Sequence, residues 1–170
     1  MRNLGLTIAA AALAASLSAC GKSTSNNQAQ TTPEAGTTAS TTESAEPSDH
    51  DKKDAVEHLP APYNTGDIVN GEAKFAICKS CHTVAPGGPD MTGPNLNGVI
   101  GRKVATKAGF TYSDALKAQT FTWDTAQLDK WLTDPKVMVP GTKMTFPGFK
   151  DPKDRIDVIA YLAAETGGHH

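Results

Sequence analysis

The fold of this chain is decided by five residues, Cys78-Lys79-Ser80-Cys81-His82. Two cysteines separated by two residues and followed directly by a histidine form the attachment signature of a c-type haem. The spacing suits the chemistry, because two thiols must reach two vinyl groups on one edge of the porphyrin while the adjacent imidazole turns beneath the iron. We therefore expect one covalently bound haem c with its iron, attached through Cys78 and Cys81 and ligated by His82.

Two other interpretations of this motif are weaker. A C-x-x-C pair can be a thiol redox site, but such pairs usually lie where a strand leads into a helix, and no strand pattern occurs here. The motif can also be half of a zinc site, but the chain has no second cysteine pair. The remaining histidines lie in the tails of the chain, at His50, His58, His169 and His170.

The second axial ligand of the iron has three candidates, Met91, Met138 and Met144. Met91 follows His82 by nine residues, too few to pass comfortably around the haem edge. Met138 lies in a short apolar run that could belong to the core. Met144 follows Pro140-Gly141, turn residues that let the backbone approach the haem face. The sequence favours Met144, with a buried gap-filling methionine as the alternative.

Composition divides the 170 residues into unequal parts. The chain is 38% apolar with a net charge of −2, which excludes a polytopic membrane protein and a strongly basic nucleic-acid binder. All ten aromatic residues lie between Tyr63 and Tyr161. Because a core needs large apolar side chains, we expect a globular domain over residues 63–170 only.

Residues 1–19 have the pattern of a signal peptide. Arg2 precedes an apolar run from Leu4 to Ala19, and its 16 residues fall short of the ~20 that a membrane-spanning helix needs. The run ends in Leu17-Ser18-Ala19-Cys20-Gly21, which resembles the lipobox of bacterial lipoproteins. That resemblance implies acylation of Cys20. An ordinary secretory signal and an uncleaved anchor are the alternatives.

Residues 20–62 are expected to form a disordered tether. Ser, Thr, Asn, Gln, Pro and acids predominate there, and no apolar periodicity accompanies the charges. Fully extended, about 40 residues reach roughly 130 Å. An acylated Cys20 would hold the domain at the periplasmic face of the bacterial cell membrane.

Four helices are expected in the globular part, and no segment alternates as a strand does. The last is the clearest, with Asp151 as its N-cap, Pro152 in its first turn and Gly167 at its end. The others are expected to begin at Asp67, Ser113 and Asp124. The intervening stretches 83–111 and 135–150 are rich in Gly, Pro, Asn and Thr, and such long loops are typical of a domain that wraps a large ligand.

Six stretches, in order over about 100 residues, resemble class I cytochrome c in its mitochondrial-like branch. They are GEAKFAICKSCHTVAPGG (71–88), TGPNLNGVIGRK (92–103), GFTYSDALK (109–117), WDTAQLDKWLTDP (123–135), VPGTKMTFPG (139–148) and DVIAYL (157–162). The resemblance implies an all-α fold of about four helices around one haem.

The same resemblance implies roles for individual residues. It assigns His82 and Met144 to the iron and gives the Pro94 carbonyl the task of holding the imidazole N–H. The haem propionates would be bonded or neutralised by Arg102, Tyr112 and Trp123, with Thr142 supporting that edge. The first and last helices would cross at Gly71, Phe75 and Tyr161.

Two residues depart from the family pattern. Trp131 stands where many relatives carry a tyrosine whose hydroxyl points at the methionine sulfur. Leu116 stands where mitochondrial forms commonly have an asparagine in a buried water network. Both changes predict a drier methionine side, which favours ferrous haem and raises the potential.

By resemblance, the expected function is one-electron transfer by a monomeric domain, without substrate turnover and hence without enzyme activity. Electrons would pass from a quinol–cytochrome c oxidoreductase to a terminal oxidase or another periplasmic reductase. A haem enzyme or gas sensor with an open iron position, and a fixed subunit of a larger complex, are the alternatives. A cationic rim for partner docking, or else ordinary solvated lysines, is expected at Lys79, Lys136, Lys143 and Lys150.

Overall fold

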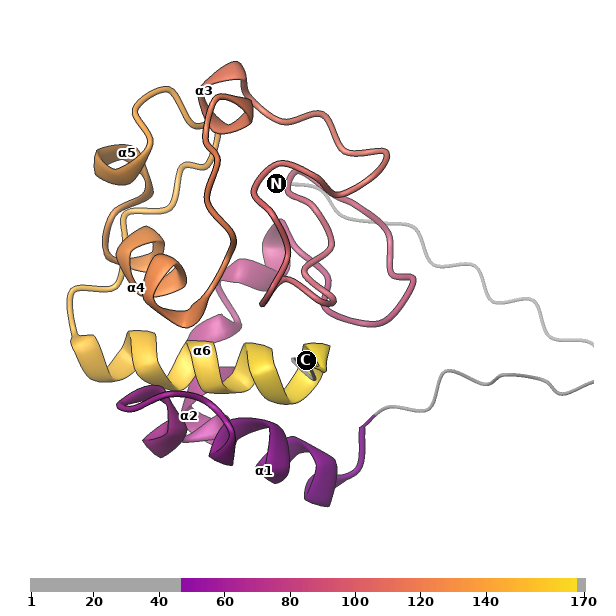
Figure 1. The fold of residues 1–170 in the computed structure, drawn as a ribbon, viewed down its shortest axis with the longest axis vertical. Coiled ribbons are helices and arrows are strands. Elements are labelled where there is room, and N and C mark those ends of the chain that lie inside the picture. Colours follow the sequence, from indigo (N-terminus) through magenta and orange to yellow (C-terminus); the bar gives the residue numbers. More distant parts are fainter. Residues whose placement is uncertain (1–46, 168–170) are drawn as a thin grey trace, which may run out of the picture. The chain divides into compact units, whose positions relative to one another are not determined.

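Helices supply all the named regular elements of residues 47–167, the part of the chain that the computed structural model describes (Figure 1). This confirms the predicted all-α class. The α-helices are α1 (Asp49–Glu57), α2 (Ile68–Phe75), α3 (Asp114–Lys117), α4 (Thr125–Thr133), α5 (Pro135–Met138) and α6 (Pro152–Thr166). Two 3-10 turns cover Tyr63–Thr65 and Cys78–Ser80.

The four expected helices begin at the predicted positions. The Asp67 carboxylate accepts the backbone N–H groups of Val69 and Asn70 at the start of α2. Equivalent side-chain caps stand before α3, α4 and α6, at Ser113, Asp124 and Asp151. Gly167 ends α6 with a φ of 62°, a left-handed conformation that glycine adopts without strain.

Helix α6 is the centre of the fold, with α1 and α2 against one side and α4 against the other (Figure 1). Its crossing with α2 depends on Gly71, where a Cβ atom would collide with the Asp157 carbonyl. Phe75 and Tyr161 flank the contact with ring centroids 5.1 Å apart. The crossing therefore uses the three residues that were expected there.

A buried carboxylate reinforces the same crossing. Asp157 is 1% exposed, and its side chain accepts hydrogen bonds from the Asp67 N–H, the Asn70 amide and the Lys153 ammonium. Burial alone would raise the pKa of this carboxyl, but the three donors together hold that pKa below its usual value. Asp157 thus ties α6 to the N-terminus of α2.

The prediction of a disordered tether as far as residue 62 is wrong for α1. Ser48 and Asp51 form a capping box at its start, and Lys52 forms an ion pair of 2.6 Å with Glu165 of α6. Val56 is buried in a small cluster with Ala160 and Ala164 of α6. The polar composition of this segment did not indicate a helix. One apolar pair, Ala55-Val56, is enough to dock it, because α6 offers the small side chains of Ala160 and Ala164 as a packing surface.

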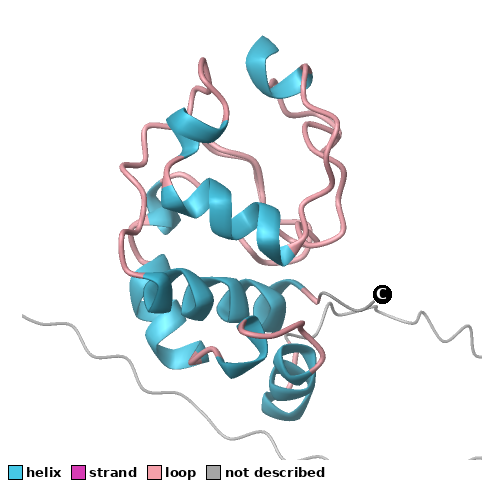
Figure 2. Cartoon of the chain, turned by 60° about the vertical axis from the view of Figure 1, so that its left-hand side comes forward, coloured by secondary structure: helices cyan, strands magenta, loops and turns pink. Residues whose placement is uncertain are grey.

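Most of the loops lie on the other side of α6 from α1 and α2, together with the helices α3, α4 and α5 (Figure 2). The stretch 83–111 contains no helix, as predicted, whereas the expected loop 135–150 begins with the short helix α5, capped by Asp134. No helix among residues 47–167 has the length and apolar character to cross a membrane. The predicted signal peptide and Cys20 lie outside the described residues.

Candidate functional site: a cavity between loops

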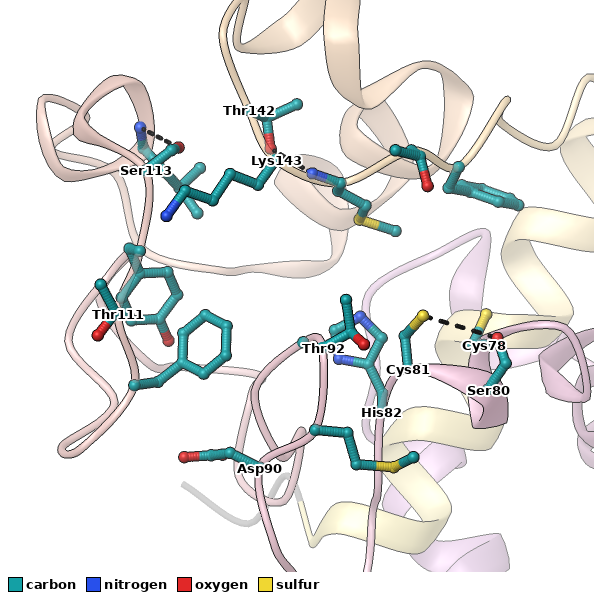
Figure 3. Close-up of a pocket in the computed structure, with 18 of the residues that line it drawn as sticks. Cys78, Ser80, Cys81, His82, Asp90, Thr92, Thr111, Ser113, Thr142 and Lys143 are labelled. Carbon is teal, nitrogen blue, oxygen red and sulfur yellow. Dashed lines mark hydrogen bonds between the residues drawn. The ribbon is translucent and has the colours of Figure 1, made fainter.

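The loops enclose a cavity of about 670 Å³ (Figure 3). One wall is the turn Cys78–His82, another is the segment 142–147, and a third comes from residues 109–116. A smaller cavity of about 90 Å³ continues behind it against the helices. Cys78, His82 and Met144 line both cavities, so the proposed thioether and iron ligands border a single apolar space.

The turn Cys78–Ser80 brings the two cysteines to the cavity. The backbone N–H groups of Cys81 and His82 both donate to the Cys78 carbonyl, at 3.0 and 2.9 Å. Both thiols are half-buried and form no disulfide. Burial raises the pKa of the Cys78 thiol to about 11, and the adjacent Cys81 adds to the shift. A neutral thiol is a poor redox nucleophile, which argues against the thiol redox interpretation.

His82 is prepared to bind a metal through one nitrogen. Its Nδ1 lies 2.7 Å from the Pro94 carbonyl, which can only accept, so Nδ1 carries the proton and Nε2 keeps its lone pair. Burial lowers the pKa of His82, although the Pro94 carbonyl opposes the shift, and the ring is therefore neutral. Gly93 packs against the ring so closely that a Cβ atom there would collide with it.

The structure separates the three candidate methionines. Met144 lies at the cavities, and its backbone N–H donates to the Thr142 hydroxyl at 3.3 Å. Met138 packs on the hydrophobic core and lines neither cavity. Met91 lies on the rim and is 47% exposed. Trp131 and Leu116, the two departures from the family pattern, both lie along the cavities that Met144 borders.

The expected propionate-binding residues are divided between the two cavities. Tyr112 lines the larger, whereas Arg102 and Trp123 line the smaller. The half-buried guanidinium of Arg102 donates to the carbonyls of Asn97 and Asn95, both at 3.3 Å. Burial lowers the pKa of Arg102, yet an arginine stays charged in proteins. A half-buried cation whose hydrogen bonds end on carbonyls suits an added carboxylate, as a haem propionate would supply.

The four lysines of the expected rim fall into two groups. Lys143 lies at the cavity mouth and Lys136 on the exposed side of α5, and neither forms an ion pair with another described residue. Lys79, by contrast, pairs with Glu72 at 3.0 Å. Lys150 lies 3.8 Å from Asp134 and donates to the Thr133 carbonyl. Two of the four lysines therefore have an acidic partner within the domain.

These residues fit a haem. The apolar cavity has two cysteine thiols on one edge, a histidine with a free Nε2 on one side and a methionine bordering the same space. A zinc site does not fit, because residues 47–167 contain no group of three His, Cys, Asp or Glu side chains that could hold a metal ion. Sequence reasoning missed the roles of Gly93, Asp90 and Asn95, although all three lie within or beside the quoted TGPN stretch.

Comparison with known proteins gives the same picture. The sequence model of the family "Cytochrome c" matches residues 68–165. Cytochrome c2 of Rhodomicrobium vannielii is 52% identical over 105 residues, which cover 62% of this chain and 84% of that protein. The cytochrome c-type cyt cy of Rhodobacter capsulatus is 50% identical over 99 residues, covering 58% of this chain and 49% of that one.

A solved structure agrees as well. Cytochrome cH from Methylobacterium extorquens is 50% identical, with a TM-score of 0.56, and the match covers 59% of this chain and all of that one. Helix α1 precedes the matched family region, which begins at Ile68. This chain belongs to the cytochrome c family, the class I c-type cytochromes that carry electrons on a covalently bound haem c.

Proposed function

We propose that this protein is a membrane-tethered one-electron carrier, attached by a lipid on Cys20 to the periplasmic face of the bacterial cell membrane. Its electron donor would be a quinol–cytochrome c oxidoreductase, and its acceptor a terminal oxidase or another periplasmic reductase. The observation that carries the electron-transfer part of the proposal is that His82 and Met144 border one apolar space. The lipobox-like stretch Leu17–Gly21 supports the anchor. Two protein ligands leave no open iron position, which favours electron transfer over a haem enzyme or gas sensor.

The residues that line the two cavities have distinct roles in this function. When bound, the haem supplies an iron that alternates between the ferric and ferrous states. Cys78 and Cys81 hold the group, His82 presents Nε2, and Arg102 provides a positive charge close to the smaller cavity. The apolar lining excludes water and so favours the less charged ferrous state. No residue needs to bind a further substrate.

The lipid anchor is tested by Cys20→Ser. Because a single acylated residue would hold the mature chain, the variant should be released almost completely into the soluble fraction, or else accumulate as unprocessed precursor. Membrane fractionation followed by haem staining measures this. Ser23→Ala is the matched control, since it leaves the lipobox intact and should remain in the membrane. Salt-resistant membrane retention of a correctly processed Cys20→Ser protein would rule out the lipid anchor.

Partner docking is tested by charge reversals in a soluble form that begins at Pro47, so that α1 is retained. The rate constant of oxidation by the membrane oxidase should fall as ionic strength rises, because exposed charges act mainly on encounter and are screened beyond roughly 8 Å at physiological salt. Lys143→Glu and Lys136→Glu should each slow the reaction roughly threefold at low salt. Lys79→Glu should have a smaller effect, because Glu72 already compensates that charge.

Stopped-flow mixing over a salt series measures these rates. A rate constant that is independent of salt and unchanged by the Lys143 and Lys136 reversals would show that docking is mainly apolar. Equal effects of the Lys79 and Lys143 reversals would show that the internal ion pair with Glu72 does not matter to the partner.

A further inference from the structure

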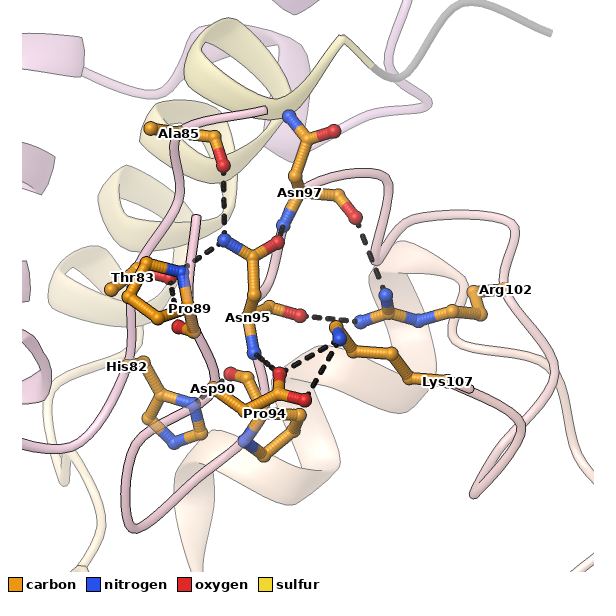
Figure 4. A network of polar contacts seen from close by, with 10 residues as sticks. All are labelled: His82, Thr83, Ala85, Pro89, Asp90, Pro94, Asn95, Asn97, Arg102 and Lys107. Atoms are coloured by element: carbon orange, nitrogen blue, oxygen red, sulfur yellow. Dashed lines mark hydrogen bonds and ion pairs between the residues drawn. The ribbon is translucent and has the colours of Figure 1, made fainter. Parts of the chain in front are cut away.

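A network of polar contacts holds the segment 83–97 beside His82 (Figure 4). Its centre is the carboxylate of Asp90, which accepts the backbone N–H of Asn95 at 2.7 Å. The same carboxylate receives the ammonium group of Lys107, 2.8 Å from one oxygen and 2.9 Å from the other. The Asp90 side chain therefore connects the two ends of the turn 90–95 and also joins this turn to the loop that carries Lys107.

Asn95 is the residue that this network fixes most firmly, and it is 3% exposed. Its side-chain amide donates to the Thr83 hydroxyl at 2.6 Å and to the Ala85 carbonyl at 3.0 Å. Its own carbonyl accepts from the Arg102 guanidinium at 3.3 Å. Backbone N–H, side chain and carbonyl are thus all held, so Asn95 has little freedom to move.

Pro94 lies between Asn95 and Gly93, and both neighbours are constrained. Gly93 lies against the His82 ring, and its backbone N–H donates to the Cys81 carbonyl at 2.9 Å. The Pro94 carbonyl can therefore meet His82 Nδ1 at 2.7 Å only while Asn95 stays in place. Hydrogen bonds weaken steeply outside a narrow range of distance and angle, so a small shift of this segment would loosen the bond to His82.

The pair of Asp90 and Lys107 is better placed to hold a segment than an ordinary surface ion pair. Their side chains are 25% and 23% exposed, whereas those of the Asp114 and Lys117 pair on α3 are 100% and 52% exposed. Partly desolvated charges interact more strongly than fully solvated ones. Lys107 also belongs to the stretch that supplies Phe110 and Tyr112 to the cavity wall, so the pair joins two walls of the site.

We propose that Asp90 and Lys107 are positioning residues for the iron ligand His82. Through Asn95 they hold the Pro94 carbonyl against Nδ1, and so they set how firmly the hydrogen bond to the imidazole is held and how the ring is oriented. Such contacts behind a metal ligand tune its basicity and its ring angle. This inference depends neither on the lipid tether nor on the redox partners proposed above.

The test follows the Nδ1 proton of His82 in the reduced holoprotein by NMR, measuring its exchange rate with solvent at one pH. Lys107→Gln removes the ion pair with Asp90. Asp90→Asn also removes that ion pair but keeps an oxygen that can accept the Asn95 N–H. Because each variant loses the ion pair alone, each should speed exchange of the Nδ1 proton roughly threefold. Asp90→Ala removes both contacts and should speed exchange about tenfold. The matched control Asp114→Asn removes an exposed ion pair and should leave the rate unchanged.

A merely stabilising role would give a different result. The slowest backbone amides of α6, such as that of Ile159, exchange through global unfolding and report overall stability. We expect the His82 ring proton to accelerate more than the Ile159 amide in each Asp90 and Lys107 variant. Equal acceleration of both protons, or an unchanged ring proton in Asp90→Ala, would overturn the proposal. If Asp90→Ala does not yield holoprotein, Lys107→Gln alone decides between these outcomes.

Discussion

Met144→Ala is expected to lower the midpoint potential of the haem by roughly 0.2 V, a quarter of the span of about 0.8 V that axial ligands cover. The physical reason is that a thioether stabilises ferrous iron more than water does. Among the described methionines Met91, Met138 and Met144, Met144 is the one that borders both cavities. The variant should also bind added cyanide or carbon monoxide.

Potentiometric titration measures the shift, and loss of the weak red absorption band of a methionine-ligated ferric haem accompanies it. Met138→Ala is the matched control, because it deletes the same side chain from a position that packs on the core and lines neither cavity. That variant should lose stability but keep its band and potential. The reverse pattern, with the band lost only in Met138→Ala, would transfer the ligand role to Met138.

Gly93→Ala is expected to prevent His82 from keeping its position. A Cβ atom at residue 93 would collide with the imidazole, and the adjacent backbone is held by the Cys81 carbonyl and by Asn95. Either the ring or the segment must move, and overpacking of this kind lowers the free energy of unfolding by about 3 kcal/mol. Chemical denaturation of purified holoprotein measures that loss, and the yield of covalently attached haem should fall with it.

Gly109→Ala provides the contrast. Its Cβ would meet nothing within 4 Å, but the residue has a φ of 82°, so the cost should be only the left-handed strain of about 1 kcal/mol. If the Gly93 and Gly109 variants lost the same amount of stability, contact with the His82 ring would not be the reason that glycine is needed at residue 93.

The sequence predicted the helices where local chemistry was sufficient. Asp67, Asp124 and Asp151 each stand before an apolar repeat, and each caps its helix in the structure. Helix α1 could not be predicted in this way, because its burial depends on Ala160 and Ala164 of α6, which lie about 100 residues further along the chain. A helix with one apolar pair forms only when a partner surface is already in place.

At the site, too, the features set by adjacent residues could be predicted from the sequence, and those set by distant contacts could not. The C-x-x-C-H motif is local, so the sequence predicted the cofactor from five adjacent residues. The contact between Asp90 and Lys107 is not local, because the two residues are 17 positions apart in loops without a periodic pattern. Only the path of the two loops around the cavity brings these charges together. For the same reason, the spacing of charges alone could not separate the compensated lysines, Lys79 and Lys150, from Lys136 and Lys143.

Helix α1 changes how far the haem can travel if Cys20 carries the proposed lipid. Only 27 residues lie between Cys20 and the cap Ser48, so a fully extended connection reaches roughly 90 Å rather than 130 Å. Effective concentration falls with about the −3/2 power of linker length, so docking α1 raises the local concentration of haem near a membrane partner about twofold. Helix α1 itself packs on α6 and contributes no residue to either cavity, so its docking shortens the connection without occupying the haem site.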